Sequence, residues 1–123
     1  RVLAAYGHTC QITGIRATYG HGDQSDAVAT PIVPVDRMSE SQRLAPRMWL
    51  SLSRTWSHLY AIGQAAISAD YEIWVDDQQI PEQYLLQLPR RNRIGLPLDE
   101  AYRPDLDALA EHWHRHVQPK SWG

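Results

Sequence analysis

The stretch Met48–Gly63, MWLSLSRTWSHLYAIG, carries the clearest information about the fold. It opens with a compact apolar run over residues 49–52. Ser53 follows, and its hydroxyl can accept a hydrogen bond from an N–H in the first turn of a helix. Gly63 can end that helix, because glycine readily adopts the conformation of a C-terminal cap. The residues between them place apolar side chains at helical spacing: Trp56, Leu59 and Tyr60.

Upstream of this helix, the apolar residues Val2–Tyr6 lead into Gly7–Gly14 (GHTCQITG), which predicts a short strand that ends in a tight turn. Cys10 and Ile12 alternate there with polar neighbours, and a glycine stands near each end. The segment Tyr19–Asp26 has the composition of a loop. Ala27–Val35 is apolar and β-branched, but its two prolines argue against a central strand because proline cannot donate to a ladder.

Short elements are expected on both sides of the central helix. Ser39–Gln42 has capping-box spacing and predicts a helical turn that Pro46 ends. Ala65–Ile67 and Tyr71–Val75 have the composition and alternation of strands, and Asp76–Gln78 is expected to turn the chain.

The last third of the chain predicts two further helices. Pro81 suits the first turn of a helix that runs to about Leu88, and Arg90–Leu98 reads as a polar loop. A final helix is expected from Pro104 or Asp105, and its apolar residues form one stripe with a period near 3.6: Leu106, Leu109, Ala110, Trp113 and Val117. Helices and strands mix without regular alternation, which predicts a single α+β domain over residues 1–123.

Composition narrows the function classes. With 43% hydrophobic residues, the chain of 123 residues can bury a core without disulfides, and Cys10 is its only cysteine. The net charge is −2 and the pI about 6.3, whereas dedicated nucleic-acid-binding domains often have a pI above about 9. No apolar run approaches the length of a membrane span. We expect a cytoplasmic location, and we interpret the start at Arg1 as a domain within a longer protein.

The segment Tyr6–Gly14 resembles the opening of the HNH endonuclease family, where Tyr-x-x-x-Cys-x-(Ile/Val)-Thr-Gly precedes a loop and an Ala-Ala-His-Ile-x-Pro motif. Ala29–Pro34 stands at the position of that second motif. Met48–Leu52 matches the family's Asn-Gly-Leu-x-Leu. Ser53–Gly63 matches the helix that carries a His and ends in Phe-Asp-x-Gly.

The resemblance continues to the end of the chain. One bacterial subgroup of restriction-type HNH domains continues with a hairpin, a Tyr-x-x-Leu helix, a Leu-Pro loop and a Pro-x-x-x-x-Leu-x-x-His helix. Tyr84–Leu88, Leu96-Pro97 and Pro104–His112 follow in that order. The resemblance implies a ββα-metal core with a C-terminal β-hairpin and two additional helices.

The residues that give this family its chemistry are missing. The general base, the Asn that orients its loop, the helix His that binds a divalent metal and the Asp after it fall on Pro31, Met48, Ser57 and Ala61. Proline offers neither a base nor a ligand, and serine is a poor lone ligand for a hard cation. We therefore expect no catalytic residue, no metal site and no cofactor.

Other histidines could form a rearranged site for a divalent metal such as Mg or Zn. His58 is one residue from the metal position, but a one-residue shift on a helix turns the side chain by about 100°. His8, His21 and Asp23 fall around the first loop, which we interpret mainly as flexible. The spacing of His112 and His116 resembles paired metal ligands, and His114 lies between them; we interpret all three as a solvated helix end.

The densest basic run is Arg90-Arg91-Asn92-Arg93. Guanidinium groups bind phosphates through paired hydrogen bonds, so the run predicts a nucleic-acid contact, with a solvated turn as the alternative. Three further arginines could share its surface: Arg43, Arg47 and Arg54. Five Trp, six Tyr and no Phe also stand out; we assign Trp56 and Trp113 to the core, and consider Trp49 and Trp74 for the core or an interface.

Three functions remain open at this level. The first is a degenerate HNH domain that contacts DNA or a protein partner within a restriction or defence protein. The second is an active metal-dependent HNH endonuclease with a rearranged site. The third is a dimerisation or structural domain. None of them involves a membrane.

Overall fold

The computed structural model describes residues 9–15, 18–19, 24–25 and 27–117, and the longest antiparallel pair in it lies at the centre of the fold. Strand β3 (Ala27–Pro31) pairs with β4 (Trp49–Ser53), in a register that runs from Ala27 opposite Ser53 to Pro31 opposite Trp49. Because Pro31 is the last residue of β3, its missing N–H interrupts no ladder bond inside the strand. The Ile32 amide then donates to the Met48 carbonyl at 2.9 Å.

The connection from β3 to β4 consists of short helical segments. The predicted capping box is confirmed: the Ser39 hydroxyl accepts from the Gln42 amide, and the Gln42 side chain accepts from the Ser39 amide at 2.8 Å. The helix ends before Pro46, as expected. The connection contains η1 (Val35–Arg37), α2 (Glu40–Leu44) and η2 (Pro46–Met48).

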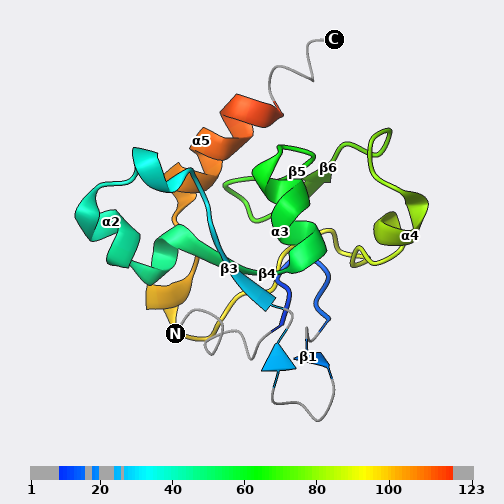
Figure 1. Ribbon diagram of the computed structural model, residues 1–123, viewed down its shortest axis with the longest axis horizontal. Helices are drawn as coiled ribbons and strands as arrows, with labels where there is room; N and C mark the ends of the chain where they lie inside the picture. Colours follow the sequence, from blue (N-terminus) through cyan, green and yellow to red (C-terminus); the bar gives the residue numbers. More distant parts are fainter. Residues whose placement is uncertain (1–8, 16–17, 20–23, 26, 118–123) are drawn as a thin grey trace.

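The helix expected after β4 is also present. Helix α3 (Arg54–Ala61) starts at Ser53, whose hydroxyl accepts from the Trp56 amide at 3.4 Å. Its buried face consists of Trp56, Leu59 and Tyr60, as predicted. The helix packs against both β3 and β4, so these elements form a strand–strand–helix unit (Figure 1).

A second antiparallel pair follows directly. Strand β5 (Ala65–Ile67) pairs with β6 (Ile73–Val75), and β5 packs against both α3 and α5 (Leu106–His116). Figure 1 shows β5 and β6 beside α3, with α5 to one side and α4 (Glu82–Leu85) to the other. The predicted strand begins later than expected because Tyr71 has a φ of 65°, which is incompatible with extended backbone.

Two predicted elements differ from the structure. Helix α4 covers only part of the predicted Pro81–Leu88 helix. In the described part of the predicted Gly7–Gly14 segment the tight turn is present, closed by the Gly14 amide that donates to the Cys10 carbonyl at 2.8 Å, but no strand precedes it. Residues 7–8 of that prediction lie outside the described residues. The remaining elements are η3 (Glu100–Tyr102) and the pair of β1 (Thr18–Tyr19) with β2 (Gln24–Ser25), which overlaps the segment expected to be a loop.

The face that α5 buries is rotated from the predicted stripe. The helix begins close to the expected start at Pro104 or Asp105, and Asp105 caps it by accepting from the Ala108 amide at 3.0 Å. The buried residues within the helix are Ala108, Leu109 and His112, whereas Leu106 is 43% exposed. Trp113 is half-buried, so its assignment to the core was wrong. Trp56 is fully buried, as predicted.

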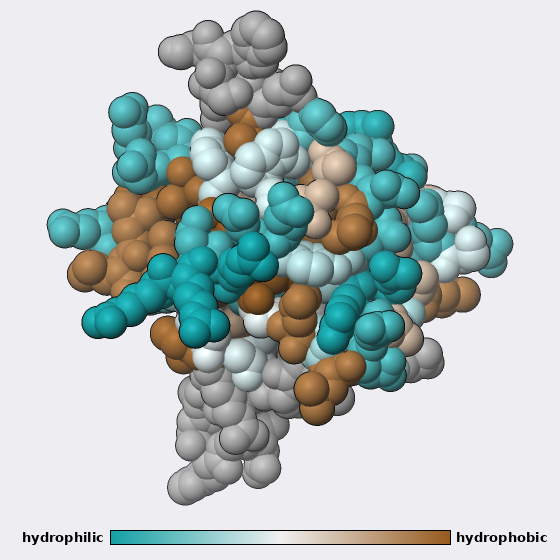
Figure 2. Space-filling model, turned by 180° about the vertical axis from the view of Figure 1, so that it is seen from behind, coloured by the Kyte–Doolittle hydropathy of each residue, from teal (hydrophilic) through white to brown (hydrophobic). Residues whose placement is uncertain are grey.

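The exposed apolar side chains are spread over several elements. Figure 2 shows hydrophobic residues at separate places on one face of the molecule, with strongly hydrophilic residues between them. The most exposed large hydrophobic residues are Leu98, Leu44 and Leu86. Within the described part of the chain, no helix has the length and apolar character that crossing a membrane requires.

Gly63→Ala tests how tightly the end of α3 is packed. Gly63 has a φ of 81°, and a Cβ there would overlap the imidazole of His116 on α5. Gly14→Ala is the matched control, because Gly14 also has a positive φ of 74° but nothing lies within 4 Å of its added Cβ. We expect Gly14→Ala to cost about 1 kcal/mol from backbone strain and Gly63→Ala clearly more, as measured by urea unfolding. Equal costs would show that His116 moves aside freely.

Candidate nucleic-acid interface

The positions that the HNH alignment identifies as catalytic all lie on the strand–strand–helix unit. Pro31 ends β3, and Met48, which is buried, directly precedes β4. Ser57 is half-buried on α3, and Ala61 is exposed at the end of the same helix. The elements on which the alignment places its catalytic positions are therefore present, but these side chains carry no base and no strong metal ligand.

Ser57 already has a partner in the structure. The Thr30 hydroxyl donates to Ser57 Oγ at 2.8 Å and joins β3 to α3. Among the described residues, no group of three or more His, Cys, Asp or Glu side chains is placed to hold a metal ion. The donor set at these positions does not fit a divalent cation, which prefers several carboxylate or carbonyl oxygens or neutral imidazoles.

Among the described candidates for a rearranged site, His112 and His116 are neighbours on α5, with ring centroids 4.5 Å apart, but no third His, Cys, Asp or Glu of the described chain joins them in a metal-binding group. His58 is exposed on α3. The side chains of His8, His21 and Asp23 lie outside the described residues. The interpretation of the C-terminal histidines as a solvated helix end was wrong for His112, which is only 5% exposed.

His112 connects α5 to the end of α3. Its Nε2 lies 2.8 Å from the Tyr60 carbonyl oxygen, and its ring stacks on the Tyr60 ring with centroids 3.8 Å apart and an interplanar angle of 6°. A carbonyl oxygen can only accept, so Nε2 carries the proton and the imidazole is the Nε2–H tautomer. Nδ1 is buried and has no hydrogen-bond partner among the described residues. The Tyr60 hydroxyl donates to the Ile32 carbonyl at 2.9 Å, which extends the connection to the end of β3.

Burial controls the protonation of both rings. It lowers the pKa of His112 from 6.5 to about 4, although the hydrogen bond to Tyr60 opposes the shift and the neighbouring His116 adds to it. Burial also raises the pKa of Tyr60 well above its usual value. His112 is therefore neutral at pH 7, and its position is explained by packing and by the carbonyl group that it satisfies at the end of α3.

The tryptophans considered for an interface are partly engaged. Trp49 is half-buried, and its indole N–H donates to the Arg43 carbonyl at 3.0 Å. Trp74 is half-buried on β6.

The predicted basic loop borders a surface hollow of about 460 Å³. Arg90, Arg91 and Arg93 line it together with residues of the Gln11–Gly14 turn. All three arginines are exposed. The structure therefore brings the basic run to a concave surface made by two segments that are far apart in the sequence.

The guanidinium groups of this loop make no hydrogen bond or ion pair with the other described residues, in contrast to those of several arginines elsewhere in the fold. Arg43 and Arg47 donate through Nε to the carbonyls of Val35 and Arg103, each at 3.2 Å. Arg37 pairs with Glu111 at 3.6 Å. Neither Arg43, Arg47 nor Arg54 lines the hollow, so the structure does not place them with the basic run.

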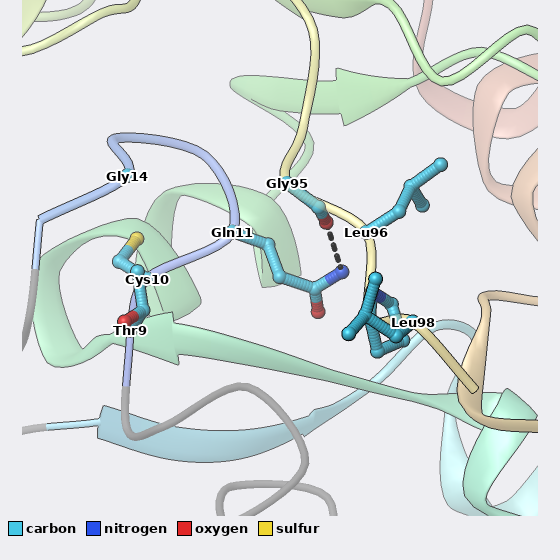
Figure 3. A pocket seen from close by; sticks show the side chains of 8 residues that line it. Thr9, Cys10, Gln11, Gly14, Gly95, Leu96 and Leu98 are labelled. Carbon is cyan, nitrogen blue, oxygen red and sulfur yellow. Dashed lines mark hydrogen bonds between the residues drawn. The ribbon is translucent and has the colours of Figure 1, made fainter.

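A second hollow of about 300 Å³ adjoins the first, and the sequence did not predict it. Figure 3 shows its lining, in which the Gln11 side chain reaches across to the Gly95 carbonyl and the side chains of Leu96 and Leu98 stand beside it. Gln11 and Gly95 line both hollows. We name the two together the Arg–Leu surface: the first hollow is basic, and the second is bordered by leucine side chains.

Gln11 fixes the geometry between the two hollows. Its amide N–H and side-chain oxygen pair with the carbonyl and amide of Ser51, at 2.8 and 2.7 Å. Its side-chain nitrogen and backbone carbonyl pair with Gly95, at 3.2 and 3.0 Å. Gln11 is only 1% exposed. Its burial could not be predicted from the sequence, in which it is a polar residue between Cys10 and Ile12.

The comparisons with known proteins are consistent with this architecture. No family model and no curated protein matches the chain. Among solved structures, the chain is similar to a modification-dependent TagI restriction endonuclease, with a TM-score of 0.64 and 18% sequence identity. The similarity covers 94% of this chain and 36% of that one, so this chain spans little more than a third of the endonuclease's length. The likeness establishes a small α+β fold similar to part of a restriction endonuclease.

The pKa of His112 predicts an acid-dependent loss of stability. Between pH 6.5 and about 4 the unfolded chain binds a proton that the folded chain excludes, so the free energy of unfolding falls as the pH falls. From pH 7 to pH 5 this group alone removes about 2 kcal/mol. His112→Gln keeps a side-chain N–H for the Tyr60 carbonyl but cannot titrate. In urea unfolding at both pH values, we expect a flatter pH dependence for the variant; identical slopes would contradict the assignment.

Proposed function

We propose that this chain is a DNA-contacting module of a restriction-type protein, built on an HNH-like ββα scaffold that does not cleave by the family's metal mechanism. The observation that carries the proposal is the set of three exposed guanidinium groups at one hollow, without a recorded partner among the described residues. The fold likeness to a restriction endonuclease supports DNA as the polyanion, because that class of enzyme acts on DNA.

The charge distribution favours a local contact over a generally basic surface. The whole chain has a net charge of −2, so its long-range field does not attract DNA in a non-specific way. Arg90, Arg91 and Arg93 can instead bind a few phosphates through charge-assisted hydrogen bonds and fix the orientation of a duplex. A contact of this kind suits a domain whose parent protein supplies further DNA-binding surface.

The proposal of an inactive site rests on chemistry at the aligned positions. Metal-assisted hydrolysis of a phosphodiester needs a cation to stabilise the developing charge and a base near the attacking water. Pro31 has no side-chain acceptor, and Ser57 Oγ is bonded to Thr30. On this alignment the scaffold positions DNA, and cleavage, if the parent protein performs it, belongs to another part of the assembly.

The DNA contact is tested with Arg91→Ala combined with Arg93→Ala. We expect weaker binding to duplex DNA, and a slope of log K against log salt concentration that is smaller by about 2, because two phosphate contacts are lost. Arg115→Ala is the matched control, since Arg115 is exposed on α5 away from the hollow. Measurement is by fluorescence anisotropy over a range of salt concentrations. Equal slopes for all the proteins would remove the basic loop from the interface.

The inactive site is tested by plasmid cleavage with Mg²⁺, Mn²⁺, Ni²⁺ and Zn²⁺. We expect no cutting by the wild-type protein or by Pro31→His, because the metal position at Ser57 lacks a ligand in both. Cutting by the single variant would show that the alignment of α3 is wrong. Metal-dependent cutting by the wild-type protein that His58→Ala abolishes would establish the rearranged nuclease instead.

A further inference from the structure

Leu98 is the most exposed large hydrophobic residue of the described chain. Its side chain is 99% exposed, and Leu96, two residues earlier, is 41% exposed. Both line the smaller hollow of the Arg–Leu surface. A single exposed leucine is common, so the significance of Leu98 depends on how its loop is held and on what lies beside it.

The backbone on both sides of Leu98 is fixed. On one side, Gly95 is bonded twice to Gln11, and the Pro97 carbonyl accepts from Arg103 Nε at 3.3 Å. On the other, the Asp99 carboxylate accepts from the Ala101 amide at 3.0 Å and caps η3. The loop therefore exposes the Leu98 side chain from a backbone that hydrogen bonds hold in place. This lowers the entropic cost of ordering the loop when Leu98 contacts a partner.

The smaller hollow is suited to apolar contact more than to hydrogen-bonded recognition. The one side-chain amide that lines it, that of Gln11, already bonds to Ser51 and Gly95. The rest of the rim is made mainly of leucine, proline and glycine. A flipped base read through its hydrogen-bonding edge would therefore find few free groups here.

Charge next to Leu98 identifies the partner. The hollow that contains Leu98 shares Gln11, Gly14 and Gly95 with the hollow lined by the three arginines. Leu98 is followed by two exposed acidic residues, of which Asp99 caps η3 and Glu100 lies 3.7 Å from Arg103. The three arginines of the adjoining hollow outnumber these two carboxylates. Exposed leucine beside clustered, accessible guanidinium groups complements a duplex, whose phosphates surround grooves with apolar base stacks inside.

We propose that Leu98, supported by Leu96, is an apolar wedge that enters a groove of duplex DNA and partly unstacks a base step while the arginines hold the neighbouring phosphates. This inference rests on the proposed function. Wedges of leucine and similar residues kink a duplex by roughly 20–90°. The kink allows the DNA to follow the concave surface of the protein. One bound duplex can then contact both hollows at the same time.

The experiment uses the full chain and duplexes that carry 2-aminopurine within the bound site, with end-labelled duplexes of the same sequence to measure bending by energy transfer. Leu98→Ala is compared with Leu86→Ala, since Leu86 is 78% exposed directly after α4 and lines neither hollow. We expect wild type and Leu86→Ala to raise 2-aminopurine fluorescence and bend the duplex. Leu98→Ala should lose most of both effects and keep the salt dependence that the arginines give.

The outcomes separate this inference from the function on which it rests. If Leu98→Ala distorts DNA as the wild type does, the wedge is wrong while the arginine contact stands. If the wild type shows no salt-dependent binding to any duplex, both proposals fail. A concentration-dependent dimer that Leu98→Ala abolishes, without DNA distortion by the wild type, would assign the leucine to a protein interface. Circular dichroism and thermal melting confirm that each variant is folded.

Discussion

The buried amide of Gln11 is the interaction on which the Arg–Leu surface depends. It pairs with Ser51 in β4 and with Gly95 in the loop after α4, through backbone and side-chain groups on both sides. A side chain that continues a strand ladder in this way satisfies polar groups that would cost about 1–3 kcal/mol each if left buried without partners. These hydrogen bonds therefore fix the positions of the Gln11–Gly14 turn, strand β4 and the basic loop relative to one another, although the three segments are distant in sequence.

The sequence predicted those elements whose ends are determined by local chemistry. Ser39 and Ser53 cap helices where expected, because a serine hydroxyl can accept from the amide three residues later at the start of a helix. The last helix begins close to its expected start, with Asp105 as its cap. Predictions failed where distant contacts decide. The turn after Thr9 is fixed by Ser51, and the buried face of α5 is fixed by Tyr60, whose ring and carbonyl favour His112 over Trp113. Neither contact can be predicted from the hydrophobic periodicity of the sequence.

The candidate site was predictable in composition and unpredictable in geometry. Arg90, Arg91 and Arg93 stand out in the sequence as a basic run, and the structure leaves them exposed at a hollow. The hollow itself forms because the Gln11–Gly14 turn lies beside the arginines. The sequence around the arginines does not indicate that this turn will lie next to them. The exposure of Leu98 could not be predicted either, because an apolar residue in a polar loop can be buried or exposed. Here the hydrogen bonds of the backbone and side chains on both sides of Leu98 decide, and the residue lies in solvent.

If the proposed function holds, the scaffold has lost its chemistry and kept its fold, because the two depend on different side chains. The core of the strand–strand–helix unit is made by Leu50, Leu52, Trp56 and Tyr60, all essentially inaccessible to solvent. Three of the four aligned catalytic positions lie at the end of β3 and on the half-buried or exposed side of α3, and the fourth, Met48, is buried directly before β4. There the Thr30–Ser57 hydrogen bond joins strand to helix and needs no ion. Under the proposed function, selection on DNA contact alone would preserve the core, the Gln11 pairing and the arginines, while leaving Pro31 and Ser57 unconstrained by catalysis.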